Sequence, residues 1–280
     1  MKLPQYKILS NGEPVKVVVD LSFFIQSSTH DLVRWSRLQP LLFPETFFFE
    51  LFTTSKSRKQ QLWAYQKFPH CENLGARLPQ VARLLDYERQ NKLPAGPVLS
   101  SFEAGNYYLN PDLAAGIYQF PDDSKAEIDK WEKKVREQSQ KLPHLTEVLL
   151  ARFPKIVSCP NSHRQKTLSD IIDKVAVDDA LIRNIYNDYA DAQSRSVAQI
   201  DKRWAVFWRI RFLLLICLKH FESYPPNNPI KASPKLLDNE WLDLEYLILG
   251  ALTGGLASND GKTIRRFFRL ASPKSWLFPR

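Results

Sequence analysis

The run VKVVVD, from Val15 to Asp20, constrains the fold more than any other part of the chain. β-branched residues that follow one another without a polar alternation are typical of a strand buried on both faces, as in the centre of a parallel sheet. The run ends in an acid, which then lies at the end of that strand. We therefore expect a buried central strand that carries Asp20 at its carboxyl end.

The next segments alternate between helix and strand. Residues 30–38 have a helical pattern, and Leu41–Pro44 is apolar and short enough to be a second strand. The apolar segment Glu45–Thr53 begins directly after Pro44 and carries acids at Glu45 and Glu50, which predicts a helix. Strand, helix, strand and helix in this order indicate an α/β fold.

The same character returns at the end of the chain. Residues 238–252 are apolar at helical spacing, residues 254–258 are a short strand candidate, and residues 263–270 read as a basic helix. Residues 275–278 are a candidate edge strand. We therefore expect the two ends of the chain, residues 1–55 and 237–280, to build one mainly parallel sheet domain.

The middle of the chain, residues 56–236, is expected to be a large helical insertion. Helices are predicted over residues 60–90, 122–141 and 143–153, and long helical stretches over 168–193 and 194–221. Residues 93–121 are rich in Pro, Gly and Asn and are expected to form an irregular loop.

Charge and cysteine content narrow the class of protein. The formal net charge is +9, which is compatible with a polyanionic partner or with solubility alone. Cys71, Cys159 and Cys217 are far apart and lack metal-binding spacing, which favours a reducing compartment. The first residues lack an apolar signal core, and the most apolar stretch, Phe212–Leu218, is too short to span a bilayer. A cytoplasmic protein without a membrane partner is therefore expected.

Four carboxylates lie at strand ends or in apolar helices, where a buried acid needs a partner. Asp20 and Asp260 each end a predicted strand, Glu50 lies inside an apolar helix, and Asp243 begins another, with Glu245 two residues on. Ligands of open parallel sheets bind at the carboxyl ends of the strands, so these acids can converge there. Clustered carboxylates repel one another, and Mg²⁺ or Mn²⁺ would remove that repulsion because both ions prefer oxygen ligands. A basic protein with an acidic metal pocket suits phosphodiester hydrolysis.

The acids and their surroundings resemble the PIN domain family of metal-dependent ribonucleases. Three blocks carry the resemblance: VVVDLS with Asp20 and Ser22, FPETFFFEL with Glu45 and Glu50, and the block from Asp243 to Asp260, which ends in SND. The resemblance covers about residues 15–55 and 237–280. Between Glu50 and Asp243 the chain is longer than a compact domain of this family needs.

The resemblance implies a PIN-like three-layer α/β/α fold and endoribonuclease activity. It implies that Asp20, Glu50, Asp243 and Asp260 hold Mg²⁺ or Mn²⁺, and it favours RNA over DNA as the substrate. A toxin-like subunit, whose insertion would bind an antitoxin-like protein partner, is a further reading.

Each site residue also has a structural reading. Asp20 and Ser22 can cap a helix, Asn259 can be a turn residue, and Glu45 can favour a helix dipole. Asp243 and Glu245 point to different faces of one helix, so one is expected to be the third acid and the other a dipole partner, with Asp243 slightly favoured.

The basic helix after the last acid is the candidate for contacts with nucleic acid. Lys262, Arg265, Arg266 and Arg269 line it. They can form a solvated face or contact phosphates. The alternative to a nuclease is a catalytically inactive PIN-like module that binds nucleic acid or a protein. P-loop, GxGxxG and GxSxG motifs do not occur in the sequence, which lowers the expectation of nucleotide-dependent or serine-hydrolase chemistry.

Overall fold

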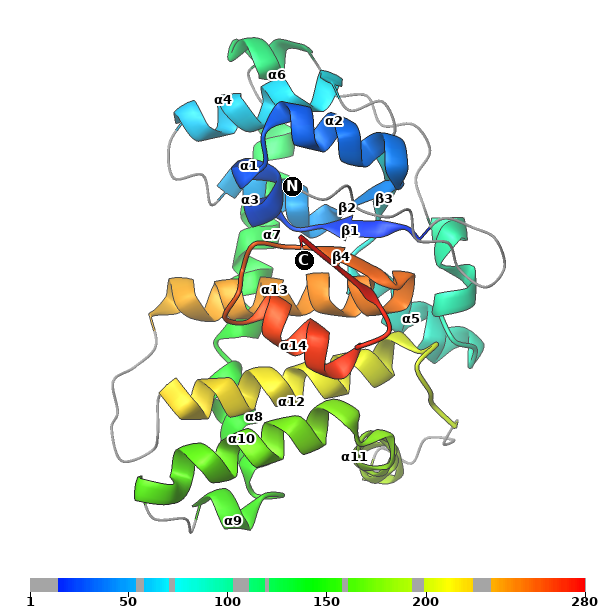
Figure 1. Ribbon diagram of the computed structural model, residues 1–280, viewed down its shortest axis with the longest axis vertical. Helices are drawn as coiled ribbons and strands as arrows, with labels where there is room; N and C mark the ends of the chain where they lie inside the picture. Colours follow the sequence, from blue (N-terminus) through cyan, green and yellow to red (C-terminus); the bar gives the residue numbers. More distant parts are fainter. Residues whose placement is uncertain are drawn as a thin grey trace.

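The computed structural model describes residues 15–53, 58–70, 74–102, 111–118, 121–157, 161–192, 199–223 and 233–279. Its centre is a five-stranded, all-parallel sheet with the order β3-β2-β1-β4-β5 (Figure 1). The strands are β1 (Val17–Val19), β2 (Leu41–Pro44), β3 (Leu74–Leu78), β4 (Gly255–Ala257) and β5 (Trp276–Phe278). The predicted α/β class with a mainly parallel sheet is confirmed, and so is the expectation that both ends of the chain share one sheet.

The central strand β1 is buried throughout, as its β-branched sequence predicts. It pairs with β2 on one side and with β4 on the other. Gly255 lies at this second junction, where an added Cβ would come within 2.7 Å of the Lys16 carbonyl oxygen. Glycine therefore allows β4 to approach β1 closely.

Helices cover both faces of the sheet (Figure 1). On one side lie α1 (Leu21–Gln26), α2 (Thr29–Leu38) and α4 (Arg58–Lys67), and on the other lie α13 (Pro234–Thr253) and α14 (Ile264–Ala271). Helix α3 (Glu45–Thr53) follows β2 and packs against α13. The buried Lys67 donates hydrogen bonds to the carbonyl oxygens of Phe24, Ile25 and Ser27, at 2.9, 2.7 and 2.6 Å, and so holds the end of α1.

A further helical layer lies beyond α13. Helix α12 (Ala205–Ser223) packs on α13, and α8 (Leu142–Leu150), α10 (Asn161–Val177) and α11 (Asp179–Ala192) pack on α12. Helix α7 (Asp122–Ser139) packs against α13 and α3, and α5 (Val81–Asn91) packs against α12 and α13. The smaller elements are η1 (Phe68–His70), η2 (Gly96–Phe102), α6 (Pro111–Ala115) and α9 (Pro154–Val157).

The structure corrects the expected organisation of the middle segment. The helix predicted over residues 60–90 is interrupted by β3, so one strand of the sheet comes from the segment expected to be a mainly helical insertion. The helix predicted over 168–193 is two helices, α10 and α11, with Asp178 between them. The segment 93–121 contains η2 and α6 rather than irregular chain alone.

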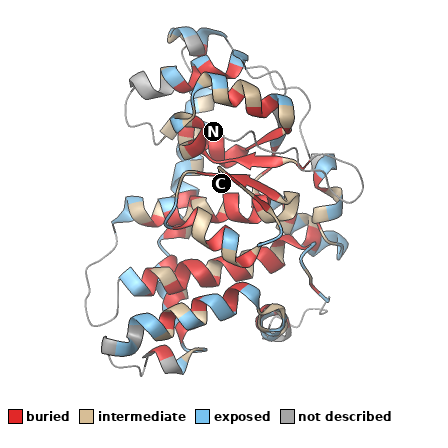
Figure 2. Ribbon diagram, in the orientation of Figure 1, coloured by how far each residue is buried: buried red, intermediate tan, exposed pale blue. Residues whose placement is uncertain are grey.

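One hydrophobic core joins the sheet to the helical layers. Side chains of β1, β2 and β4 belong to the same buried cluster as those of α12 and α13 (Figure 2). None of the described helices is both long enough and apolar enough to cross a membrane.

Candidate active site

The chain order of the sheet reverses between β1 and β4, and this is where open α/β sheets bind ligands. Asp20 directly follows β1, and its backbone N–H donates to the Ala257 carbonyl oxygen at 2.9 Å. Ser258, Asn259 and Asp260 directly follow β4. The topology therefore brings the two strand-ending acids, Asp20 and Asp260, to one edge of the sheet.

The Asp20 carboxylate is buried and accepts several hydrogen bonds. It caps α1 by accepting from the Ser22 N–H at 3.0 Å, and it accepts from the hydroxyls of Ser22 at 2.5 Å and Ser258 at 2.6 Å. Burial raises the pKa of Asp20 above its ordinary value, and repulsion from Asp260 adds to the rise, whereas the hydrogen bonds oppose it. Ser22 also accepts from the Asn259 N–H at 3.3 Å and thus joins the ends of both strands.

Asp260 is held by the start of the basic helix. Its Oδ1 accepts from the N–H groups of Lys262 at 2.8 Å and Thr263 at 3.0 Å, and its own N–H donates to the Ser258 hydroxyl at 3.0 Å. The Thr263 hydroxyl accepts from Lys219 Nζ at 2.6 Å. Lys219 lies on α12, so the helical layer supplies a cation at the rim of this site.

Glu50 reaches the site from α3. Burial and the negative charge of Asp20 raise the pKa of Glu50 to about 8. The hydroxyl of the buried Tyr246, on α13, donates a hydrogen bond to Glu50 Oε2 and favours the ionised carboxylate. Burial and the neighbouring carboxylates also raise the pKa of Tyr246 well above its ordinary value.

Asp243, one helical turn before Tyr246, completes the group. It lies in the middle of α13, because this helix begins at Pro234, so the expectation that Asp243 begins a helix and that Glu245 interacts with its dipole was wrong. Burial raises its pKa well above the ordinary value, and repulsion from Asp260, Asp20 and Glu50 raises it further, against the attraction of Lys219. Electrostatic repulsion therefore links the four acids predicted from the sequence, which are Asp20, Glu50, Asp243 and Asp260. We define them as the acid cluster.

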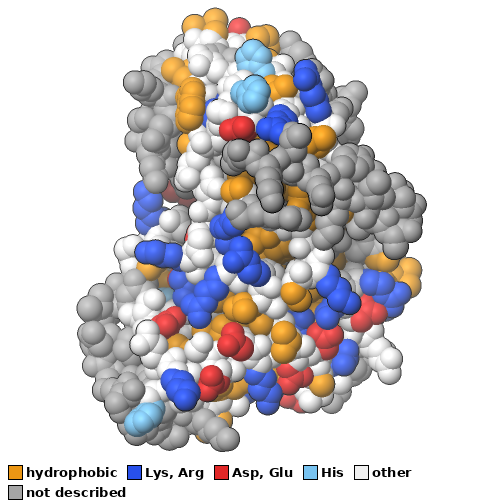
Figure 3. Space-filling model, in the orientation of Figure 1, with side chains coloured by type: hydrophobic (Ala, Val, Ile, Leu, Met, Phe, Trp, Pro, Cys, Tyr) orange, Lys and Arg blue, Asp and Glu red, His pale blue; other side chains and the backbone are white. Residues whose placement is uncertain are grey.

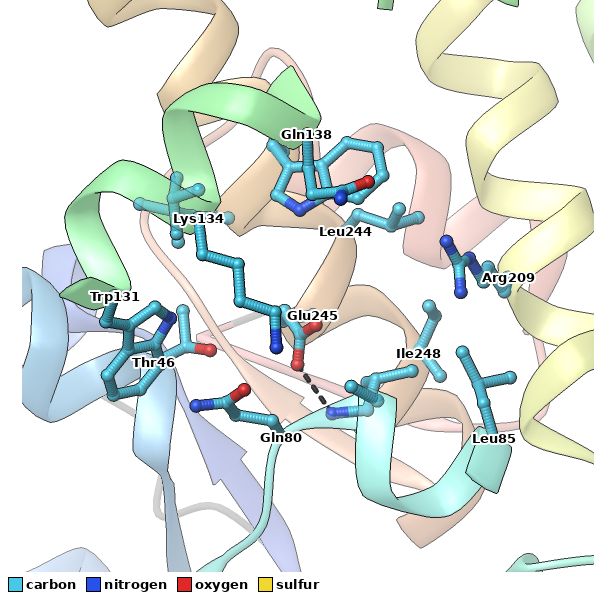
Figure 4. Close-up of a pocket in the computed structure, with 15 residues that line it drawn as sticks. Thr46, Gln80, Leu85, Trp131, Lys134, Gln138, Arg209, Leu244, Glu245 and Ile248 are labelled. Carbon is cyan, nitrogen blue, oxygen red and sulfur yellow. Dashed lines mark hydrogen bonds between the residues drawn. The ribbon is translucent and has the colours of Figure 1, made fainter. Parts of the chain in front are cut away.

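Glu245 lies apart from the acid cluster. Its carboxylate accepts from the Val81 N–H, at 2.8 Å, beside a separate hollow lined by α3, α5, α7, α12 and α13 (Figure 4). Burial raises its pKa to about 7, and the positive charges of Arg209 and Lys134 oppose the rise. Glu45 likewise points elsewhere, because it pairs with Arg77 at 2.8 Å. The charge of Asp20 thus raises the pKa of Asp243 and has no such effect on Glu245.

The donor chemistry of the acid cluster fits Mg²⁺ or Mn²⁺, since all its side chains offer carboxylate oxygens and the charges repel. The side-chain positions do not form a coordination shell. Among the described residues, no group of three or more His, Cys, Asp or Glu side chains is arranged to hold a metal ion. The hydroxyls of Ser22, Ser258 and Tyr246 instead occupy hydrogen-bonding positions on the carboxylates.

The basic residues in and just before α14 divide into two groups. Arg265 donates to the backbone carbonyls of Ser258 at 2.9 Å and Pro279 at 2.5 Å, so it connects the ends of β4 and β5. Lys262 and Arg269 are exposed, and Arg266 is half-buried. Figure 3 shows Lys and Arg side chains on the middle of the face on which α14 lies.

Sequence reasoning missed the residues that contact the acid cluster. Tyr246 lies three residues after Asp243, a spacing that places two side chains on one helix face. Ser258 precedes the Asn259–Asp260 pair and was available to the same argument as Ser22. Lys219 carried no local signal, because only the packing of α12 brings it to Thr263.

No protein-family model matches this chain, and no curated protein or solved structure is significantly similar to it. The resemblance to PIN domains therefore rests on the three sequence blocks and stays a prediction.

Proposed function

We propose that this protein is a metal-dependent nuclease that hydrolyses phosphodiester bonds in RNA. The observation that carries the proposal is the place of the acids: Asp20 and Asp260 follow β1 and β4 where the strand order reverses, and the Ser258 hydroxyl bonds to both residues. Repulsion among the acids also raises the pKa values of Asp20, Glu50 and Asp243. Such a group is costly without a cation. The choice of RNA over DNA rests on the resemblance to PIN domains.

The residues of the site would have three roles: metal binding, orientation of the carboxylates and contact with phosphates. Asp20, Glu50, Asp243 and Asp260 would hold Mg²⁺ or Mn²⁺. When bound, such an ion activates water for attack on phosphorus and stabilises the leaving oxygen. Ser22, Ser258 and Tyr246 orient the carboxylates through the hydrogen bonds that they donate. Lys262 and Arg269, exposed on and before α14, would contact backbone phosphates.

The first test is cleavage of one labelled RNA under single-turnover conditions with Mn²⁺ or with EDTA. We expect cleavage only with Mn²⁺ and a loss of about 100-fold or more for Asp20→Asn, equivalent to ~2.7 kcal/mol of transition-state stabilisation. Asp129→Asn, which changes an exposed acid on α7, is the matched control and should cut like the wild type. Equal cleavage by Asp20→Asn and the wild type would contradict the proposal.

A second measurement is independent of cleavage. Mn²⁺ should raise the melting temperature of the wild type and raise it less in Asp243→Asn, because an ion that binds only the folded state stabilises it. If Mn²⁺ has no effect on either protein and RNA is still bound in EDTA, the alternative of an inactive RNA-binding module holds. Two features favour that alternative. The hydroxyls of Ser22 and Ser258 bond to the Asp20 carboxylate, and no three described acids are arranged around one point as metal ligands.

A further inference from the structure

Glu245 faces a hollow that the acid cluster does not use. The hollow has a cavity volume of about 230 Å³ and lies between α13, which carries Glu245, and the neighbouring helices α5, α7 and α12 (Figure 4). Thr46, one turn before Glu50 on α3, lines its wall. On α13, Asp243 and Glu245 are two residues apart and so point to different helix faces, which separates the hollow from the acid cluster.

The carboxylate of Glu245 can accept more hydrogen bonds than the described residues donate to it. Among the described residues it accepts one hydrogen bond, from the Val81 N–H to Oε2, and makes no ion pair. Oε1 has no hydrogen-bond donor in the described part of the chain. A half-buried carboxylate that lies beside a cavity, and has one oxygen without a hydrogen-bond donor, can bind a ligand there.

The rest of the lining combines apolar walls with a few polar groups. Trp131, Trp241 and Ile248 supply aromatic and aliphatic surface. Lys134 and Arg209 approach from opposite sides of Glu245 (Figure 4). Aromatic surface with convergent polar groups is typical of a small-molecule site, and 230 Å³ lies just below the ~300–1,000 Å³ of drug-sized sites, which suits one nucleobase rather than a larger ligand.

A carboxylate with cations nearby but not paired to it can select among the bases. Guanine presents two adjacent donors, N1–H and the N2 amino group, followed by the O6 acceptor. Adenine and cytosine present an amino donor next to a ring-nitrogen acceptor, and uracil presents one donor between two acceptors. An acceptor placed against an ionised carboxylate is repelled. Guanine alone offers two donors, one to the unused Oε1 and one to the second acceptor position of Oε2, which also accepts from the Val81 N–H, and it leaves O6 for a cation.

We propose that this hollow is a guanine-binding pocket in which Glu245 reads N1–H and the N2 amino group, and Arg209 or Lys134 donates to O6. The choice of a nucleobase as ligand rests on the proposed action on RNA. The pocket would make cleavage sensitive to a guanine near the cut phosphate.

The test is calorimetric titration of the full chain with 5′-GMP, 5′-IMP and 5′-AMP in EDTA at pH 8. The three nucleotides share ribose and phosphate and differ only in the edge of the base. IMP lacks the N2 amino group, and AMP places an acceptor at N1. We expect GMP to bind roughly tenfold more tightly than IMP, the effect of one charge-assisted hydrogen bond, and more tightly still than AMP.

Variants separate this pocket from the acid cluster. Glu245→Gln should remove the preference for GMP over IMP, while Asp243→Asn, two residues away on the same helix, should keep it. Leu85→Trp, at a half-buried position of the wall, should fill the hollow and abolish GMP binding. Equal affinities of the wild type for the three nucleotides, no binding at all, or an unchanged preference in a folded Glu245→Gln protein would overturn the proposal.

The two proposals can fail separately. A GMP preference without Mn²⁺-dependent cleavage would contradict the nuclease and keep the pocket. Cleavage of RNA together with equal affinities for GMP, IMP and AMP would keep the nuclease and contradict the pocket.

Discussion

At the scale of single residues, the enclosed carboxylates determine how stability depends on pH. The pKa of Glu50 rises from 4.5 to about 8 on folding, mainly through burial. Between these values the folded protein holds a proton that the unfolded chain has released. Stability therefore falls as the pH rises through this window, and the elevated pKa values of Asp20 and Asp243 act in the same direction.

We predict that Glu50→Gln becomes more stable relative to the wild type as the pH rises from 5 to 8 in EDTA. The gain is at most about tenfold in the folding equilibrium constant per pH unit. Urea unfolding of both proteins at several pH values measures it. Glu132→Gln, which changes an exposed acid on α7, should leave the pH dependence unchanged. A constant stability difference between Glu50→Gln and the wild type would show that Glu50 titrates normally.

The residues of the acid cluster could be named from the sequence because strand ends and helix positions determine where such acids lie. Asp20 and Asp260 follow buried strands, and the topology brings them together. The choice between Asp243 and Glu245 could not be made from the sequence, because both faces of α13 are covered, one by the acid cluster and the other by the hollow. Tyr246 and Lys219 depend on tertiary packing.

At the scale of elements, α14 shows that one basic segment can serve two purposes. Arg265 bonds to backbone carbonyls at the ends of β4 and β5, whereas Lys262 and Arg269 are exposed. A charge count along the sequence treats these residues alike. Only the structure distinguishes Arg265, which connects the strand ends, from Lys262 and Arg269, which a ligand can reach.

We predict that the double variant Lys262→Gln, Arg269→Gln binds single-stranded RNA with a weaker salt dependence. Loss of two phosphate contacts should reduce the slope of log affinity against log salt by about 1.4, because fewer counterions are released. Fluorescence anisotropy in EDTA at several salt concentrations measures the slope. Lys133→Gln, Lys141→Gln removes the same charge from exposed positions elsewhere and should keep the slope. Equal slopes for all three proteins would assign the α14 cations to a solvated face.

Strand β3 could not be predicted from the sequence. The strands β1 and β2 are continuous apolar runs, and the short apolar patterns of β4 and β5 beside turn residues predict strands as well. Residues 74–78, with the sequence LGARL, contain no β-branched residue and stand between two helical segments, α4 and α5. Pairing with the edge of β2, rather than local preference, makes this segment a strand.

At the scale of the whole molecule, the helical layers and the sheet share one core. Helix α13 contacts β1 and β4 on one side and α12 on the other, and buried residues of all these elements belong to one cluster. An inserted domain with its own core would instead meet the sheet at an interface with few shared contacts. The middle of the chain is therefore not expected to fold apart from its ends.

We predict that the sheet and the helical layers unfold together. Native-state hydrogen exchange, measured by mass spectrometry at increasing urea, should give the same opening free energy for amides of β1, β4 and α12, because separating α12 from α13 would expose the buried side chains of both. Amides of α6, a five-residue helix at the surface, serve as the control and should exchange through smaller openings. A lower opening free energy for α12 than for β1 would show that the helical layers are a separate folding unit, and the cation of Lys219 would then move away from the acid cluster whenever these layers open.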